Sequence, residues 1–448
     1  MTKVVLIGAG STSFSPSVVA DMARNPDLQD ATLTMVDVDA KILGVVARIA
    51  GRIVAAHGSG LRIEATTDRE EALRGARFVI TTFAVGGAQA WDVDVEIPKS
   101  YGISMPVGDT VGPGGLSRAL RHIPLLVEIA RDMERLCPSA HLFNYTNPLT
   151  VLVRAVRKAT TIDAVGLCAG PELTRTQFAD FVGIPRPELE VHGAGVNHCF
   201  WLLDARHHGV DVYPRARELA RRPDWPAPPA EDTGYHRMWP AAGTRPFVAQ
   251  LLDSLGYFPG PWDRHVTEFF PEFFPDGPMA DERYGLQSYP VRQIVERKAR
   301  QRDYFDQQAD ERNPLDPALA HGRVGHSEEV VGVIASVVKN RGLRQFGNVP
   351  NRGLVPNLPP ETIVEVPLTF GAYGWRATQG GDLPPSVLPW LARRVAAYEL
   401  TVEAALTGDR RIALQALLAD GWVKGTATAG RLLDDLLRAQ ARFLPRFA

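Results

Sequence analysis

Apolar residues in the first 170 positions alternate between short runs and segments with helical spacing. Residues 4–7 form a β-branched run that ends in glycine, and apolar residues at helical spacing follow it, including Val18 and Met22. The same alternation continues, with strands expected at 31–36, 61–65, 78–82, 140–144 and 163–168 and helices at 42–56, 69–73, 116–136 and 149–158. Strands that are apolar on both faces indicate a doubly wound parallel sheet with helices on both sides.

The pattern changes after residue 170. Residues 221–247 are rich in Pro, Trp and Arg, which predicts a long irregular excursion over a surface or an active site. Helical spacing returns at 290–310 and 327–340, a β-rich stretch lies at 362–368, and the segment 387–447 is helical in pattern. We therefore predict an α/β protein with a first domain over residues 1–170 and an α+β domain over residues 171–448.

Composition excludes several classes of protein. The chain has 448 residues, a net charge of −2 and no basic block, which argues against nucleic acid or an anionic membrane as partner. Its three cysteines, Cys137, Cys168 and Cys199, are too few and too widely spaced for a disulfide framework. The apolar N-terminus is too short for a membrane span and lacks a signal-peptide cleavage site. We expect a cytoplasmic protein.

The turn after the first run has the composition of a phosphate-binding turn. Gly8, Gly10 and Ser11 follow the strand directly, so the backbone can approach a pyrophosphate and the next helix offers free N–H groups. The third glycine of the usual pattern is missing, since Ser13 or Phe14 stands there. A simple tight strand-to-helix turn is the alternative.

An acidic residue at the end of the second run favours one dinucleotide. Asp37 can accept hydrogen bonds from both ribose hydroxyls and would repel a 2′-phosphate, so the pattern favours NAD over NADP and a Rossmann-type domain. The alternative is that Asp37 caps the next helix, although Asp39 could equally do so.

Four polar motifs each follow an apolar run, and we expect them at strand ends facing the cofactor. They are Gly108-Asp109-Thr110 with GPGG, Asn144-Tyr145-Thr146-Asn147-Pro148, Gly166-Leu167-Cys168 and Gly195-Val196-Asn197-His198. Cys168 and His198 have the donor chemistry for a divalent transition metal. A buried apolar role for Cys168 and a hydrogen-bonded core role for His198 are the alternatives, and we assign Cys199 to the core.

Taken together, these motifs resemble the NAD- and manganese-dependent glycosidases of glycoside hydrolase family 4, whose fold is similar to lactate and malate dehydrogenases. The resemblance is carried by IGAGS, GDTVGPGGLSRALRHIP, NYTNP, VGLC, GVNHxxW and GNVPNRGLVPNLPPETIVEVP, in family order over nearly the whole chain. It implies a homodimer or homotetramer and a reaction in which NAD takes hydride from C3 of a sugar, a base removes the C2 proton, and the aglycone leaves by elimination.

The resemblance also implies roles for individual residues. Cys168 and His198 match the ligands of a divalent metal, Mn²⁺ in the family pattern, that polarises the C2 and C3 oxygens. Asp263 is the expected base, with Tyr257 behind it. Asp109 is an expected catalytic residue and Asn147 an expected contact of the nicotinamide or the sugar. The remaining expected substrate contacts are Asn197, Arg264, His265 and Arg121, with His265 also a potential metal ligand.

One position departs from the family pattern and bears on the substrate. Ala169 stands where the family commonly has Asp, Asn or His, and alanine neither protonates a leaving group nor binds a metal. The arginines near the motifs suit an oxyanion, which favours an anionic glycoside such as a uronide or a 6-phospho- or 6-sulfo-sugar (a sulfoquinovoside, for example); they are Arg118, Arg121, Arg264, Arg323 and Arg352. Structural ion pairs are the alternative for these arginines.

Two other functions remain open from the sequence. A 2-hydroxy-acid or sugar dehydrogenase with net NADH release would need a proton relay, for which Asp163 and His198 are the available pair. A non-catalytic NAD-dependent sugar sensor would bind both ligands without exchanging the C2 proton.

Overall fold

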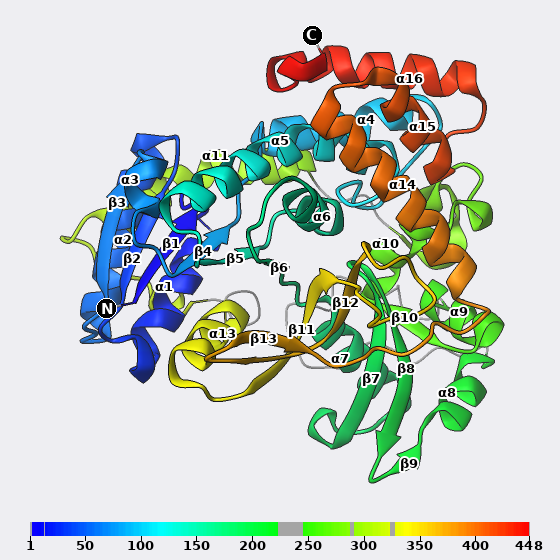
Figure 1. Ribbon diagram of the computed structural model, residues 1–448, viewed down its shortest axis with the longest axis horizontal. Helices are drawn as coiled ribbons and strands as arrows, with labels where there is room; N and C mark the ends of the chain where they lie inside the picture. The colour runs from blue at the N-terminus through cyan, green and yellow to red at the C-terminus, as the bar shows by residue number, and fades with distance from the viewer. Residues whose placement is uncertain (1, 13, 223–244, 287–290, 323–327, 448) are drawn as a thin grey trace.

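One mixed sheet runs through the whole molecule. The computed structural model describes residues 2–12, 14–222, 245–286, 291–322 and 328–447. Within them, thirteen strands form a sheet whose main order is β10-β8-β7-β12-β11-β6-β5-β4-β1-β2-β3, with β13 beside β12 and β9 beside β8 (Figure 1). The sheet is parallel from β3 to β6 and antiparallel from β6 onward.

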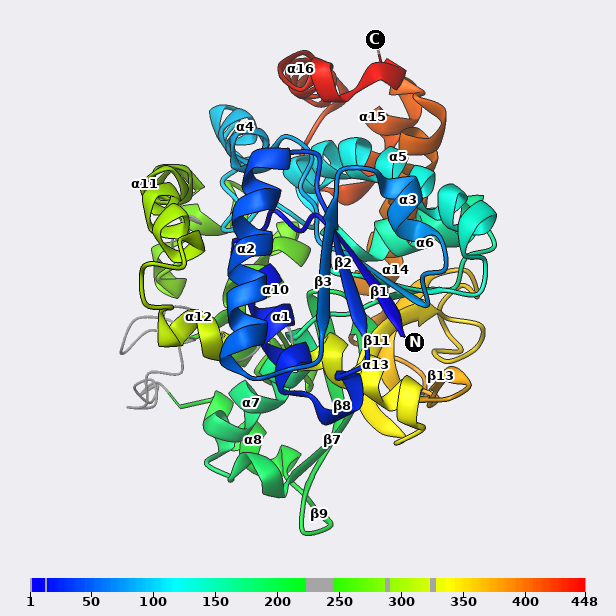
Figure 2. The ribbon, with the colours of Figure 1, turned by 90° about the vertical axis from the view of Figure 1, so that its left-hand side faces the viewer.

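The parallel half confirms the predicted doubly wound sheet. Helices α1 and α2 lie on one side of its strands and α3, α5 and α6 on the other (Figure 2). The strands are β1 (Lys3–Ile7), β2 (Thr32–Val36), β3 (Arg62–Thr66), β4 (Phe78–Thr81), β5 (His141–Asn144) and β6 (Ala164–Gly166). The helices are α1 (Ser15–Arg24), α2 (Ala40–Ala56), α3 (Arg69–Leu73), α4 (Gly87–Ser100), α5 (Gly112–Leu136) and α6 (Leu149–Ala159). β3 is the edge strand and is correspondingly exposed.

The antiparallel half continues the sheet by strand pairing. β11 (Leu343–Pro350) joins β6 through Asn348 opposite Gly166, and β12 (Ile363–Gly371) joins β7 (Leu189–Val196) through Glu365 opposite Gly195. A long hairpin of β7 and β8 (Cys199–His207) projects from the body (Figure 1). The remaining strands are β9 (Val210–Asp211), β10 (Phe258–Gly260) and β13 (Gly374–Ala377).

Helices cover this second half and its C-terminus. The C-terminal helices α14 (Leu388–Thr407), α15 (Arg410–Asp420) and α16 (Thr426–Ala439) pack against α4, α5 and α6. The others are α7 (Gly170–Val182), α8 (Tyr213–Ala220), α9 (Phe247–Leu255), α10 (Trp262–Val266), α11 (Val291–Ala309), α12 (Pro317–His321) and α13 (Glu328–Lys339). No described helix is both long and apolar enough to cross a membrane.

The predicted elements of the first 170 residues agree with the structure to within a few positions. α4 and β11 were not predicted. Most of the predicted irregular excursion, residues 223–244, lies outside the described residues. One sheet crosses the predicted domain boundary at residue 170, since β6 pairs with β11. The boundary itself stays a prediction.

Candidate active site

The turn after β1 brings a backbone close to the next parallel strand. Gly8 has a φ of 91°, and a Cβ there would lie 2.7 Å from the carbonyl oxygen of Thr82. The N–H of Gly10 donates to Oδ2 of Asp37 over 2.8 Å. The Ser11 side chain accepts from the N–H of Phe14, directly before α1. The turn therefore combines glycine, an acidic residue and a helix N-terminus, as a dinucleotide turn requires.

Asp39, not Asp37, caps the helix that follows β2. Its Oδ1 accepts from the N–H groups of Lys41 and Ile42, which leaves Asp37 at the strand end beside Gly10. The next side chain, Val38, is 98% exposed. The carboxylate of Asp37 and the exposed side chain of Val38 are thus consecutive at the carboxyl end of β2.

Polar residues from three of the sequence motifs meet around Asp109. Asn147 donates from Nδ2 to Asp109 Oδ2 over 3.1 Å, and the hydroxyl of Thr110 donates to Asp109 Oδ1 over 2.6 Å. The same Thr110 oxygen lies 2.8 Å from Nδ1 of His198. Because the hydroxyl hydrogen is used toward Asp109, the oxygen accepts from Nδ1–H, and Nε2 of His198 keeps its lone pair for a ligand.

The Asp109 loop is a helix start and not the strand end that the sequence predicted. The preceding residues form α4, and the loop leads into α5. Glycine is needed there because a Cβ on Gly114 would lie 2.5 Å from the carbonyl oxygen of Gly108. The buried carboxylate of Glu268 accepts from the N–H groups of Val107 and Gly108 over 2.7 and 2.9 Å, which fixes the loop from below.

Three potential metal ligands gather in this loop region. One donor atom each from Asp109, His198 and His265 lie within 4.8 Å of one another. The rings of His198 and His265 are 3.9 Å apart, and Nδ1 of His265 is buried without a hydrogen-bond partner among the described residues. An orphaned ring nitrogen beside a second imidazole and a carboxylate fits a divalent transition metal.

Ionisation also suits this donor set. Burial is the main cause that lowers the pKa of His198 and that of His265, so both rings stay neutral. Burial opposes the charge on Asp109, but neighbouring groups that favour the carboxylate, Arg118 and the hydroxyl of Thr110 among them, outweigh burial and lower the pKa of this carboxyl. Neutral imidazoles next to a carboxylate are the protonation states that metal binding requires.

His122 positions Asn147 and was not identified from the sequence. Its Nε2 accepts from the N–H of Val85, so Nδ1 carries the hydrogen that it donates to the carbonyl oxygen of Asn147 over 2.8 Å. Burial lowers the pKa of His122 well below its ordinary value. In the sequence, only its position in the motif GDTVGPGGLSRALRHIP pointed to a role for His122 in the site.

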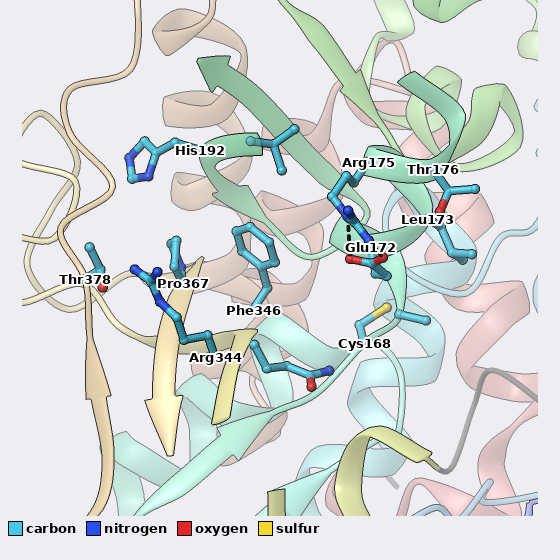
Figure 3. Close-up of a pocket in the computed structure, with 13 residues that line it drawn as sticks. Cys168, Glu172, Leu173, Arg175, Thr176, His192, Arg344, Phe346, Pro367 and Thr378 are labelled. Carbon is cyan, nitrogen blue, oxygen red and sulfur yellow. Dashed lines mark hydrogen bonds and ion pairs between the residues drawn. The ribbon is translucent and has the colours of Figure 1, made fainter. Parts of the chain in front are cut away.

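Cys168 lies outside the group formed by Asp109, His198 and His265. It follows β6, its Sγ accepts from the N–H of Gly170, and it lines a cavity of about 570 Å³ together with Ala169. Figure 3 shows this cavity between α7 and the strands of the antiparallel half, with Phe346 in its middle. Arg344 and Thr378 lie at the far end from Cys168 (Figure 3).

The predicted base, Asp263, accepts hydrogen bonds from the start of a helix, and its role as the base stays a prediction. Its two carboxylate oxygens accept from the N–H groups of Phe247 and Val248 over 2.7 and 2.9 Å, at the start of α9. Burial raises its pKa to about 6 against these two hydrogen bonds. Asp263 therefore acts as a cap for α9. Tyr257 is half-buried beside the ring of Tyr213, 5.7 Å away.

Two predicted substrate contacts are buried. Arg121 is almost fully buried and makes two hydrogen bonds to Asp94, at 2.8 and 2.6 Å. Asn197 is fully buried near Glu365, whose pKa burial raises to about 7, and the amide group of Asn197 has no hydrogen-bond partner among the described residues. Both substrate contacts stay predictions.

The other predicted arginines divide by position. Arg118 donates from Nε to the carbonyl oxygen of Asn147 and covers the Trp91 ring, so it stays next to the site. Arg264 is half-buried beside His265. Arg352 is exposed, and Arg323 lies outside the described residues.

Comparison with known proteins identifies the class. The family model "Family 4 glycosyl hydrolase" matches residues 3–184, and the model of its C-terminal domain matches residues 193–423. The chain belongs to the family 4 glycosyl hydrolases and is an enzyme of the glycosidase class.

Particular relatives extend over the full length. An alpha-galactosidase of Bacillus subtilis (strain 168) is 30% identical over 457 residues, covering 100% of both chains. The structure of the putative glucosidase lplD from Bacillus subtilis has a TM-score of 0.84 at 28% identity and covers 98% of this chain and 100% of that one.

More distant structures share the fold. A 6-phospho-alpha-glucosidase from gut microorganisms, in complex with NAD and Mn²⁺, has a TM-score of 0.82 at 20% identity and covers 99% of both chains. A malate dehydrogenase from Plasmodium falciparum has a TM-score of 0.51 at 12% identity, covering 91% of this chain and 99% of that one. The predicted dehydrogenase-like fold is thereby confirmed.

Proposed function

We propose that this glycosidase uses NAD to oxidise C3 of an anionic glycoside transiently, so that the C2 proton becomes acidic and the aglycone leaves by elimination. Water then adds to the double bond and the hydride returns to C3. The observation that carries the proposal is the relay from Asp109 through Thr110 to His198, which frees one imidazole nitrogen beside His265. The family membership supplies the reaction class.

The N-terminal turn is the proposed NAD site. NAD, when bound, supplies the hydride acceptor. Gly8, Gly10 and Ser11 would leave room for the pyrophosphate and offer backbone donors to it. Asp37 would accept from the ribose hydroxyls, and Val38 would cover the base. Asn147, at the carboxyl end of the neighbouring β5, would face the nicotinamide end.

His198 is the centre of the proposed metal site. A divalent metal, manganese in our proposal, supplies a Lewis acid for the C2 and C3 oxygens when bound. Asp109 and His265 lie next to His198, and Cys168, which lines the cavity outside this group, is a further proposed ligand on the family resemblance. Thr110 and Asn147 hold the Asp109 carboxylate in place for this role.

The cavity next to Cys168 is the proposed glycoside site. Its volume of about 570 Å³ suits a small ligand. Arg344 is exposed and makes no ion pair or hydrogen bond to the described residues, so its guanidinium is available to an anionic group. Because Arg121 is paired with Asp94, we assign binding of the anionic group to Arg344 instead.

The base that removes the C2 proton and the acid that protonates the leaving group are assigned separately. We assign the base to Tyr257, because the carboxylate of Asp263 already accepts two hydrogen bonds from α9. Ala169 has no proton to give, so the proposal favours substrates with good leaving groups, such as aryl glycosides.

The decisive experiment is a panel of anionic and neutral aryl glycosides in D₂O, with and without NAD, Mn²⁺ and chelator. We expect aglycone release only with NAD and metal, deuterium at C2 of the released sugar, and no net NADH. Net NADH without aglycone would identify a dehydrogenase, and binding without C2 exchange would identify a sensor. Full activity of NAD-free protein would refute the proposal. The Tyr257→Phe variant should lose the exchange.

A further inference from the structure

A second cluster of potential metal ligands lies far along the chain from the proposed active-site ligands. Glu188 belongs to the η2 turn (Arg186–Glu188) that precedes β7, His207 is the last residue of β8, and His208 follows it in the turn before β9. Leu189 pairs with His207 in the β7–β8 ladder, which places Glu188 across from the turn. The hairpin carries this cluster at the lower end of the molecule in Figure 1.

The distances suit a small divalent cation. Oε2 of Glu188 lies 2.9 Å from Nε2 of His207 and 3.4 Å from Nε2 of His208. The three donor atoms lie within 4.8 Å of one another, and the two rings are 4.2 Å apart. Tetrahedral zinc with bonds of about 2.0–2.1 Å separates neighbouring ligand atoms by about 3.3 Å. The three atoms already stand close to these positions.

The three side chains are accessible from solvent. Their exposures are 44% for Glu188, 34% for His207 and 73% for His208. Two imidazoles with one carboxylate are a donor set that zinc accepts, and solvent is free to supply the fourth ligand.

The turn between β8 and β9 allows His208 to be replaced without strain in the backbone. His208 and Gly209 have φ values of 49° and 79°, and a two-residue turn with both φ values positive favours Asn-Gly. Asparagine at position 208 therefore suits the backbone and removes the imidazole.

We propose that Glu188, His207 and His208 bind a zinc ion that fastens the tip of the β8–β9 hairpin to the η2 turn. This site is independent of the proposed active-site metal, because it shares no residue with it.

Zinc alone is the probe. Full-length protein treated with chelator is titrated with zinc against a chromophoric competitor, and crystals are measured at the zinc absorption edge. We expect the wild type to bind one zinc more than the His208→Asn and Glu188→Gln variants, or these variants to bind that zinc at least about tenfold more weakly. An anomalous peak should lie between Glu188 and the two histidines.

His321→Asn is the matched control, since it removes an exposed histidine outside both clusters. It should keep the wild-type stoichiometry. Equal zinc stoichiometry and affinity in wild type and His208→Asn, or no anomalous peak at Glu188, would overturn the proposal. Loss of zinc in the His321→Asn control as well would also overturn it.

Discussion

The hydroxyl of Thr110 decides which nitrogen of His198 is available. It donates to Asp109, so it accepts from Nδ1–H of the imidazole and leaves Nε2 open. A metal-binding histidine commonly needs such a partner on its other nitrogen to fix ring and tautomer. The hydroxyl of Thr110 thus connects the carboxylate of its own motif to the imidazole of another.

Thr110→Val tests this relay, since valine has the same shape without the hydroxyl. We expect Mn²⁺ affinity to fall about 10–100-fold, because the His198 ring loses its orientation and tautomer. Isothermal titration calorimetry with Mn²⁺ measures this affinity. Thr110→Ser keeps the hydroxyl and should bind like wild type, whereas unchanged affinity in Thr110→Val would exclude the relay.

The Glu268 carboxyl gives the loop a pH dependence. Burial is the main cause that raises its pKa to about 8, from an ordinary value of 4.5, with Asp109 and Asp420 adding to it. A raised carboxyl pKa in the folded state stabilises the fold below pH 4.5, and this stabilisation is lost as the pH rises toward 8.

Glu268→Gln should remove that dependence. The amide oxygen can still accept from Val107 and Gly108, while no charge forms at high pH. We expect Tm of the variant relative to wild type to rise between pH 5 and pH 9, measured by calorimetry at both ends. A difference in Tm between variant and wild type that does not change with pH would contradict the raised pKa of Glu268.

At the scale of elements, hydrophobic periodicity predicted β1 to β6 and the α-helices between them except α4. It failed for β11, because LRQFGNVP carries polar residues, Gly and Pro where a strand pattern should be apolar. Pairing on both sides, to β6 and β12, makes it a strand, and no local signal contains that information. The motifs around Asp109 and His198, Thr110 included, were found from the sequence, but the hydrogen bonds that connect them were not.

The hydrogen bonds of Asp263 to α9 could not be predicted from the sequence for the same reason. Its donors lie on α9, whose N-terminus is preceded by Pro246 and has no side-chain cap of its own. The loop GYFPGPWDRH gives no sign that a helix start sixteen residues earlier uses its carboxylate.

Asp263→Ala should therefore destabilise the protein by about 1–2 kcal/mol, because two buried N–H groups of α9 lose their acceptor. Urea denaturation measures the loss, and the folded fraction should keep C2 exchange. A variant as stable as wild type but without exchange would restore Asp263 as the base.

At the scale of the whole molecule, pairing of β6 with β11 makes the two predicted domains one sheet. Residues 1–170 expressed alone would leave β6 as an open edge and uncover apolar α5 and α6 surface that α14 contacts. We expect this fragment to aggregate in size-exclusion chromatography. A monomeric, folded fragment that binds NAD would show that the boundary separates two autonomous units.

The continuous sheet also limits how ligands enter and leave. Hinge bending between the two halves of the sheet would break the strand pairing between Gly166 and Asn348, so we expect the halves to keep their relative position during turnover. We then expect substrate access to depend on movements of the loops around α10 and Asp109, and these movements to limit the rate of turnover.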